Sequence, residues 1–159
     1  YLEDQGMPLA YHHHMGTVVE TQEDTERLLD NTHDSVKLTL DTGHMLFAKG
    51  DSKKIFENYN DRLLHVHCKD IRRNVLEKSL KEDLSFREAF LEGAFTVPGD
   101  GCIDYKPLFD ILKKNSYSGW LVVEAEQDPK KANPLEYAKK GYKYLNDTLK
   151  KSDIEIDKK

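Results

Sequence analysis

Imidazole, carboxylate and amine side chains gather at the ends of four short apolar runs in this sequence. The first run contains His12, His13 and His14, and because side chains alternate along a strand, His12 and His14 would share one face. The other runs end in Asp41 with His44, in His65 and His67 with Lys69 and Asp70, and in Glu124 with Glu126. A mixed set of imidazoles and carboxylates suits Mn²⁺, Co²⁺, Zn²⁺ or Fe²⁺ better than Ca²⁺. The sequence therefore predicts a divalent metal site.

Each of these residues also has a structural interpretation. His13 would point away from its two neighbours, and we expect it to be structural. His65 lies deeper in its run than His67 and could support that side chain from behind. Asp41 could cap the segment that follows it, because Asp before Thr-Gly-His favours a tight turn.

The two glutamates at the end of the last run have an alternative as well. Glu124 and Glu126 could pair with Lys69 or Arg72 in a salt-bridge network. Ionisable residues at the ends of four strands are costly to bury without a cation or ion pairs. We therefore expect one shared site rather than a coincidence. The convergence therefore favours a site.

Strand-like and helix-like segments alternate along the chain. The apolar runs at 8–15, 36–41, 62–69 and 119–126 are typical of strands, and the segments at 21–31, 51–60, 85–93, 105–115 and 133–151 are typical of helices. Capping signals mark several helix starts, namely Asp51, Ser85 with Glu88, and Asn133 followed by Pro134. This alternation predicts an α/β fold with parallel strands joined by right-handed crossovers.

Two architectures share that alternation, an open doubly wound sheet and a (β/α)₈ barrel. No Gly-rich phosphate loop follows any of the four strands, which argues against a nucleotide-binding sheet. In each of the last three runs one face is apolar and the other ends in ionisable groups at the carboxyl end, where barrel enzymes place their active sites. A barrel needs eight such units, so we expect residues 1–149 to be the C-terminal half of a (β/α)₈ barrel and residues 150–159 to be a disordered charged tail. The start at Tyr1 leads us to expect a piece of a longer protein.

The segment 92–105 contains three glycines and a proline, which favour turns. It is either a surface turn or a lid over the strand ends, and composition leaves both open.

Composition excludes several classes of protein. The chain has 159 residues, a net charge of −5 and no basic stripe, so we expect no nucleic-acid partner. No apolar run is long enough to span a bilayer, and we expect no membrane partner and no signal peptide. The two cysteines, Cys68 and Cys102, are too few for a disulfide framework, which favours the reducing cytoplasm.

Five segments together resemble the inosose dehydratase family: YHHHMGT, LDTGHMLFAKGD, HVHCKDIR, FTVPGDGCIDY and GWLVVEAEQDP. This family belongs to the xylose-isomerase-like (β/α)₈ barrels, and the resemblance covers residues 9 to about 145. It implies dehydration of scyllo-inosose (2-keto-myo-inositol) to a trihydroxycyclohexanedione in inositol breakdown. It also implies Mn²⁺ or Co²⁺ as the metal, and an association with glutathione.

The resemblance further implies four metal ligands at strand ends. Three are assigned by motif: Asp41 of DTGH, His67 of HCKD and Glu124 of VVEAE. Where the superfamily often has a first Glu, this chain has YHHH, so the fourth ligand is His12, His14 or Glu126. Among these we expect His12.

A ketone acidifies the neighbouring C–H bond, so dehydration needs a base for that proton and an acid for the leaving hydroxyl. We expect His44, Lys69 and His14 to be catalytic, and the choice between acid and base stays open. The residues expected to bind the substrate, a small cyclic keto-polyol, are Glu126, Asp70 and Arg72.

Two other functions fit the same residues. A keto-sugar isomerase or epimerase would begin with the same proton removal and differ in where the proton returns. An inactive truncated fragment is the alternative of another class, because a half barrel leaves open sheet edges. A homo-oligomer that closes the barrel is a further possibility.

Overall fold

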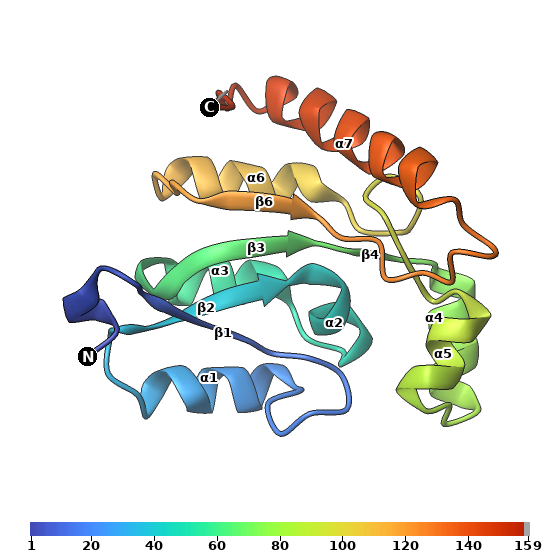
Figure 1. The fold of residues 1–159 in the computed structure, drawn as a ribbon, viewed down its shortest axis with the longest axis horizontal. Helices are drawn as coiled ribbons and strands as arrows, with labels where there is room; N and C mark the ends of the chain where they lie inside the picture. Colours follow the sequence, from blue (N-terminus) through green and yellow to red (C-terminus); the bar gives the residue numbers. More distant parts are fainter. Residues whose placement is uncertain (158–159) are drawn as a thin grey trace.

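Four parallel strands form one sheet in the computed structural model, which describes residues 1–157 (Figure 1). The strands are β1 (Leu9–His12), β2 (Val36–Asp41), β3 (Leu63–Cys68) and β6 (Trp120–Val123), and they lie in the order β1-β2-β3-β6. All three pairings are parallel, so the four carboxyl ends lie along one edge. This sheet and its helices form about half of a (β/α)₈ barrel, the architecture that the ionisable strand ends favoured over an open doubly wound sheet.

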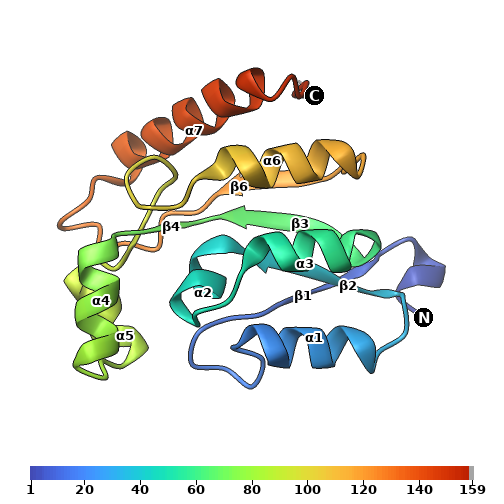
Figure 2. The same cartoon turned by 180° about the vertical axis from the view of Figure 1, so that it is seen from behind.

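The helices occupy two places relative to the sheet. One group packs on one face: α1 (Gln22–Asp30), α3 (Ser52–Asn58), α6 (Tyr105–Lys114) and α7 (Pro134–Lys151). The other elements gather at or beyond the carboxyl ends of the strands (Figures 1 and 2): α2 (Thr42–Phe47), α4 (Arg73–Lys81), α5 (Phe86–Glu92) and the two-residue strands β4 (Asp70–Ile71) and β5 (Phe95–Thr96). Short 3₁₀ helices span Glu3–Gln5 and Asn60–Arg62.

Side-chain alternation divides the sheet into an apolar and a polar face. Leu38 and Leu40 of β2 are fully buried under the helices, together with Val66 and Cys68 of β3. The intervening residues of both strands face the other way, and these are Thr39, Asp41, His65 and His67. The face covered by the helices therefore forms the hydrophobic core, and the opposite face holds the ionisable residues.

The predicted capping signals operate at the helix starts. The Ser85 hydroxyl accepts from the backbone N–H of Glu88, and the Glu88 carboxylate accepts from the N–H of Ser85. Asp51 caps α3, and Asn133 caps α7 ahead of Pro134. Each cap satisfies backbone N–H groups that have no partner within their helix.

The structure differs from the sequence-based expectation in several elements. Three strands are shorter than predicted: β1 spans Leu9–His12, β3 spans Leu63–Cys68 and β6 spans Trp120–Val123. Helices α2 and α4 and the antiparallel pair β4–β5 were not anticipated. Helix α2 begins at a cap supplied by Asp41, the last residue of β2, so strand and helix share a residue and no turn separates them. Helix α4 has no side-chain hydrogen bond at its N-cap, Arg72, and so lacks a start signal.

Helix α7 runs to Lys151, so the expected boundary between domain and tail at residue 149 falls inside it. Beyond the helix, Ser152 is buried, and Ile154 packs against the main core. The last two positions of the expected tail, residues 158–159, lie outside the described residues.

Candidate metal and acid–base centre

The ends of β1, β2 and β3 and the residues after β6 bring a first set of ionisable groups together. Asp41 lies directly opposite His67 in the β2–β3 pairing. Nδ1 of His67 is 2.7 Å from Oε2 of Glu124 and 3.6 Å from Oδ2 of Asp41. Nε2 of His12 is 3.5 Å from the same Asp41 oxygen. The first set is therefore Asp41, His67, Glu124 and His12, the four metal ligands expected from the sequence.

Asp41 is held by three backbone contacts and aims one oxygen at the set. Its Oδ1 accepts from the N–H groups of Gly43 and His44, both at 2.9 Å, and so begins α2. Its own N–H donates to Nε2 of His13 at 3.1 Å. Burial would raise the pKa of Asp41, but the contacts with His12 and His67 and the charge of Lys69 hold it well below its ordinary value.

The first set fits a divalent ion because its buried polar atoms converge as ion pairs, without an aligned hydrogen bond among them. Among residues 1–157, Asp41 Oδ2, His67 Nδ1, Glu124 Oε2 and His12 Nε2 are buried and have no hydrogen-bond partner. Buried polar atoms in native proteins almost always have a partner. Contacts with Asp41 and Glu124 raise the pKa of His67 to about 9, so without an ion a proton takes the place of the metal there. Nitrogen and oxygen ligands in this ratio suit a divalent ion of the Mn²⁺ to Zn²⁺ series.

A second set of groups surrounds the amine of Lys69, which is fully buried. Its Nζ donates to Oε2 of Glu126 at 2.6 Å and to Nε2 of His44 at 2.8 Å. It also lies 3.2 Å from Oδ2 of Asp41 and 3.4 Å from Oε2 of Glu124. Burial opposes the charge, but the three carboxylates outweigh it and raise the pKa of Lys69. Lys69 is therefore an ammonium ion in this site.

The pKa values of His44 and Glu126 are both lowered, but for different reasons. Burial lowers the pKa of His44, so its ring is neutral and its Nε2 accepts a hydrogen bond from the Lys69 ammonium. Burial alone would raise the pKa of Glu126, but His44 and Lys69 lower it to about 2. The site therefore combines a fixed ammonium, a neutral imidazole and a charged carboxylate.

His14 completes the second set from the end of β1. Its Nδ1–H donates to the carbonyl oxygen of Met15 at 2.7 Å, which leaves Nε2 as the free nitrogen, 3.8 Å from Oε1 of Glu126. The ring of His14 lies 3.7 Å from the ring of His44, centre to centre. The ring of Phe86, the first residue of α5, meets His14 edge to face at 5.1 Å. An apolar wall thus borders the polar centre on the side of α5.

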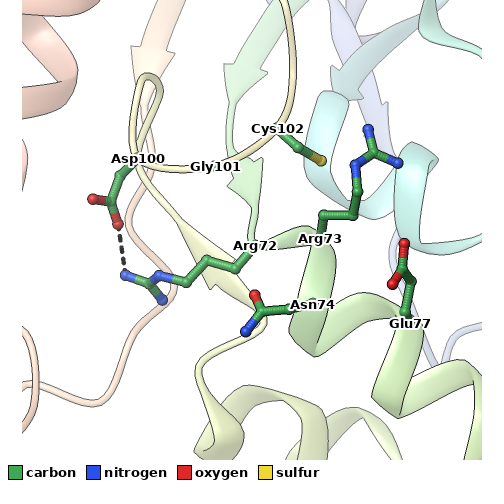
Figure 3. Close-up of a pocket in the computed structure, with 7 residues that line it drawn as sticks. All are labelled: Arg72, Arg73, Asn74, Glu77, Asp100, Gly101 and Cys102. Carbon is green, nitrogen blue, oxygen red and sulfur yellow. Dashed lines mark hydrogen bonds and ion pairs between the residues drawn. The ribbon is translucent and has the colours of Figure 1, made fainter.

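Two expected substrate-binding residues are engaged elsewhere in the structure. The carboxylate of Asp70 accepts from the N–H groups of Gly99 and Ile103, and so holds the segment 99–103. The guanidinium of Arg72 donates to Asp100 at 2.7 Å, and Figure 3 shows this side chain turned away from Arg73. Eight of the ten expected site residues lie together in the first and second sets. The other two, Asp70 and Arg72, bind the loop at residues 99–103 instead. The segment that could be a turn or a lid is therefore tied down at its centre.

Sequence reasoning missed the contributions of two residues near the centre. The interaction of His13 with the backbone of Asp41 was not anticipated, although strand alternation did place His13 apart from His12 and His14. Phe86 was unnoticed because it lies on a helix outside the four βα units. The capping box at Ser85 fixes where α5 begins, and it was the available signal for Phe86.

Among residues 1–157, no helix combines the length and the apolar character that a bilayer span requires.

Comparison with known proteins identifies relatives of this chain. An inosose dehydratase from Clostridium beijerinckii is 52% identical over 146 residues, which cover 91% of this chain and 49% of the relative. An inosose dehydratase from Bacillus licheniformis is 51% identical over 142 residues, which cover 89% of this chain and 47% of the relative. The chain therefore spans about half the length of the curated relatives it matches.

Solved structures share the fold. The IOLI protein, solved with a bound zinc atom, matches with a TM-score of 0.69 and 21% identity, over 95% of this chain and 52% of that chain. At this identity the likeness concerns the fold, and it confirms that the four strands and their helices form part of a barrel. The family described as the xylose isomerase-like TIM barrel matches residues 1–148, more than nine-tenths of the sequence. The chain thus belongs to the xylose isomerase-like TIM barrel family.

Proposed function

We propose that this chain carries the metal centre and the proton-transfer groups of a dehydratase that converts scyllo-inosose to trihydroxycyclohexa-1,2-dione. The observation that carries the proposal is the convergence of four buried ligand atoms that lack hydrogen-bond partners among the described residues. The identity of about half of all aligned positions with inosose dehydratases supports the choice of substrate.

Asp41, His67 and Glu124 would hold the ion, with His12 as the fourth ligand. A divalent ion bound there would supply Lewis-acid stabilisation for the negative charge that develops on the substrate's ketone oxygen. The mixed imidazole and carboxylate donors suit ions of the Mn²⁺ to Zn²⁺ series. Mn²⁺ or Co²⁺ is the proposed ion because of the resemblance to the inosose dehydratase family. Glutathione stays a prediction from the resemblance, and the cytoplasmic location stays a prediction from the two cysteines.

His14 is the proposed general base. In neutral His14 the Nδ1 proton is committed to the carbonyl of Met15, so Nε2 keeps its lone pair. The side chain is 27% exposed, which leaves it accessible to a substrate bound above the strand ends. Nε2 of His14 would take the proton from the carbon next to the ketone.

Lys69 is the proposed general acid. Its ammonium is held by Asp41, Glu124 and Glu126 and therefore carries a proton at neutral pH. It would donate that proton to the leaving hydroxyl, so the C–O bond breaks with release of water. His44 would position Lys69 through the 2.8 Å contact, and Phe86 would exclude water from the reacting carbon. Contact of Asp70 and Arg72 with the substrate stays a prediction, since both now hold the segment beside the site.

A chimeric barrel tests the proposal. This chain would replace the segment that it matches in the Clostridium beijerinckii relative, and the product would be incubated with scyllo-inosose and Mn²⁺. We expect a product lighter by one water, no reaction after treatment with a chelator, and a loss of at least about 100-fold in kcat for His14→Ala.

Two results would contradict the proposal. A product of unchanged mass would indicate an isomerase or epimerase. A folded chimera that binds Mn²⁺ and leaves scyllo-inosose unchanged would mean that the substrate is wrong. The matched control is His33→Ala, a surface histidine in the turn before β2, which should leave kcat unchanged.

A further inference from the structure

The amine of Lys69 occupies a position that resembles a metal-binding position. It lies within 3.4 Å of one oxygen from each of three carboxylates, those of Asp41, Glu124 and Glu126. It also lies 2.8 Å from a ring nitrogen, Nε2 of His44. Two of these oxygens, Asp41 Oδ2 and Glu124 Oε2, also belong to the first set. The amine therefore shares ligands with the proposed ion, as the second ion does in two-metal sites.

Charge counting supports this comparison. The three carboxylates carry three negative charges in a site where Asp41 and Lys69 are fully buried. One divalent ion and one ammonium supply three positive charges, so the site becomes neutral. Two divalent ions would exceed the carboxylate charge by two with the ammonium present and by one without it, so the ammonium raises the electrostatic cost of a second ion. The amine thus limits the centre to one ion.

The groups around the amine could hold an ion of their own. His14, His44 and Glu126 each offer one ligand atom, and these atoms lie within 4.8 Å of one another. Nε2 of His44 and Oε2 of Glu126 are the atoms to which Lys69 donates, so the amine and a second ion compete for the same lone pairs.

We propose that the Lys69 ammonium takes the place of a second cation, and that removing it creates a second divalent metal site on His14, His44 and Glu126. The inference rests on the proposed function only in that the first set holds one ion. It predicts that an altered chain binds more metal than the unaltered chain, which is opposite to the usual result of substituting a residue in a metal centre.

The test is a titration of the purified chain with Mn²⁺, by equilibrium dialysis and electron paramagnetic resonance. We expect one Mn²⁺ per unaltered chain, and two per chain for Lys69→Met, with the broadened spectrum of two neighbouring ions. Methionine keeps most of the apolar stem, which packs closely against Gly43. Lys69→Gln provides a second variant in case the methionine form does not fold, and circular dichroism checks the fold of each.

Controls separate the second site from other effects. Adding His14→Ala to Lys69→Met should return the stoichiometry to one, because His14 belongs to the second set alone. Lys106→Met, a substitution on the exposed surface of α6, should leave it at one. Two ions on the unaltered chain, or one ion on folded Lys69 variants, would overturn the inference. No ion on the unaltered chain would contradict the proposed function instead.

Discussion

At the scale of single residues, protons and the metal ion compete for the same atoms. Nδ1 of His67 lies between the carboxylates of Asp41 and Glu124, and these contacts raise its pKa to about 9. His65, two residues earlier on the same strand, has a lowered pKa because it is partly buried and adjoins His67. Two histidines on one strand therefore differ in charge at neutral pH.

Metal binding should release about one proton per chain at pH 7, because an ion can bind His67 only after the ring loses its proton. Between about pH 6 and pH 8 the apparent affinity for Mn²⁺ should rise about tenfold per pH unit, since this range lies below the pKa of His67. Calorimetry in buffers of different ionisation enthalpy measures the proton release. His67→Gln should abolish it, and the control His65→Gln should leave it unchanged. Release that persists without His67 would contradict the prediction.

Gly43 determines where the stem of Lys69 lies. A Cβ added at Gly43 would be 2.7 Å from Cγ and 2.9 Å from Cδ of Lys69, and Cβ atoms in proteins essentially never come this close to another carbon. We expect Gly43→Ala to lower the free energy of unfolding by about 1–3 kcal/mol and to displace the amine. Urea denaturation checks the first effect. The additional change Lys69→Ala removes the clashing atoms, so Gly43→Ala should then cost less; an equal cost in both backgrounds would contradict the explanation.

At the scale of elements, the antiparallel pair β4–β5 and the loop that contains Asp100 connect the end of β3 with α7. The carboxylate of Asp100, in the loop after β5, accepts from Arg72 and from Thr96 at 2.7 Å and also contacts Lys140 of α7. Burial would raise the pKa of Asp100, but Lys140, Thr96 and Arg72 lower it. Asp100 therefore links three elements through its charge.

The contribution of Asp100 to stability should depend on pH. Since its pKa is lower in the folded chain than the unfolded value of 3.8, its contribution is present above that pH and is lost as the pH falls through the folded pKa. Asp100→Asn should cost about 2 kcal/mol at pH 7 and less at pH 3, as measured by urea denaturation. The control is Asp110→Asn, at an exposed pair with Lys106, which should cost much less at both pH values because solvent screens the pair. An equal cost of Asp100→Asn at both pH values would contradict the prediction.

The sequence predicted those elements whose local signals agree with their final environment. Ser85, Asp51 and Asn133 are hydrogen-bonding caps at helix starts, and strand alternation separated Leu38 and Leu40 from Asp41. Helix α2 was not predicted because its N-cap, Asp41, is also the last residue of a strand. Asp70 was expected at the site by its position after Lys69, yet the N–H groups that it binds come from a loop about thirty residues away. Contacts between residues that lie so far apart along the chain leave no periodic pattern in the sequence.

At the scale of the whole molecule, the sheet has two open edges among the described residues. Strand β1 pairs only with β2, and β6 pairs only with β3. Trp120, at the start of β6, is 71% exposed and lies beside His65 on the polar face. Exposed strand edges and large apolar side chains favour association with other chains.

We expect the isolated chain to associate reversibly through these edges, with a sedimentation coefficient that rises with concentration. Trp120→Lys should weaken the association at least about tenfold, because a charge on an edge strand opposes pairing. Tyr142→Lys, at a similarly exposed aromatic on α7, is the matched control and should leave association unchanged. Equal effects of both substitutions would point to another surface.

His13 joins the end of β1 to the end of β2 through a side chain. The last paired residues of these strands are His12 and Thr39, and further along an imidazole ring stands between the strands, where the N–H of Asp41 reaches Nε2 of His13. A ring spaces two strands more widely than a direct backbone hydrogen bond does. The separation of the two strand ends at Asp41 is therefore set by one imidazole ring. A shorter side chain at position 13 would leave the N–H of Asp41 without its acceptor and loosen the junction of β1 with β2.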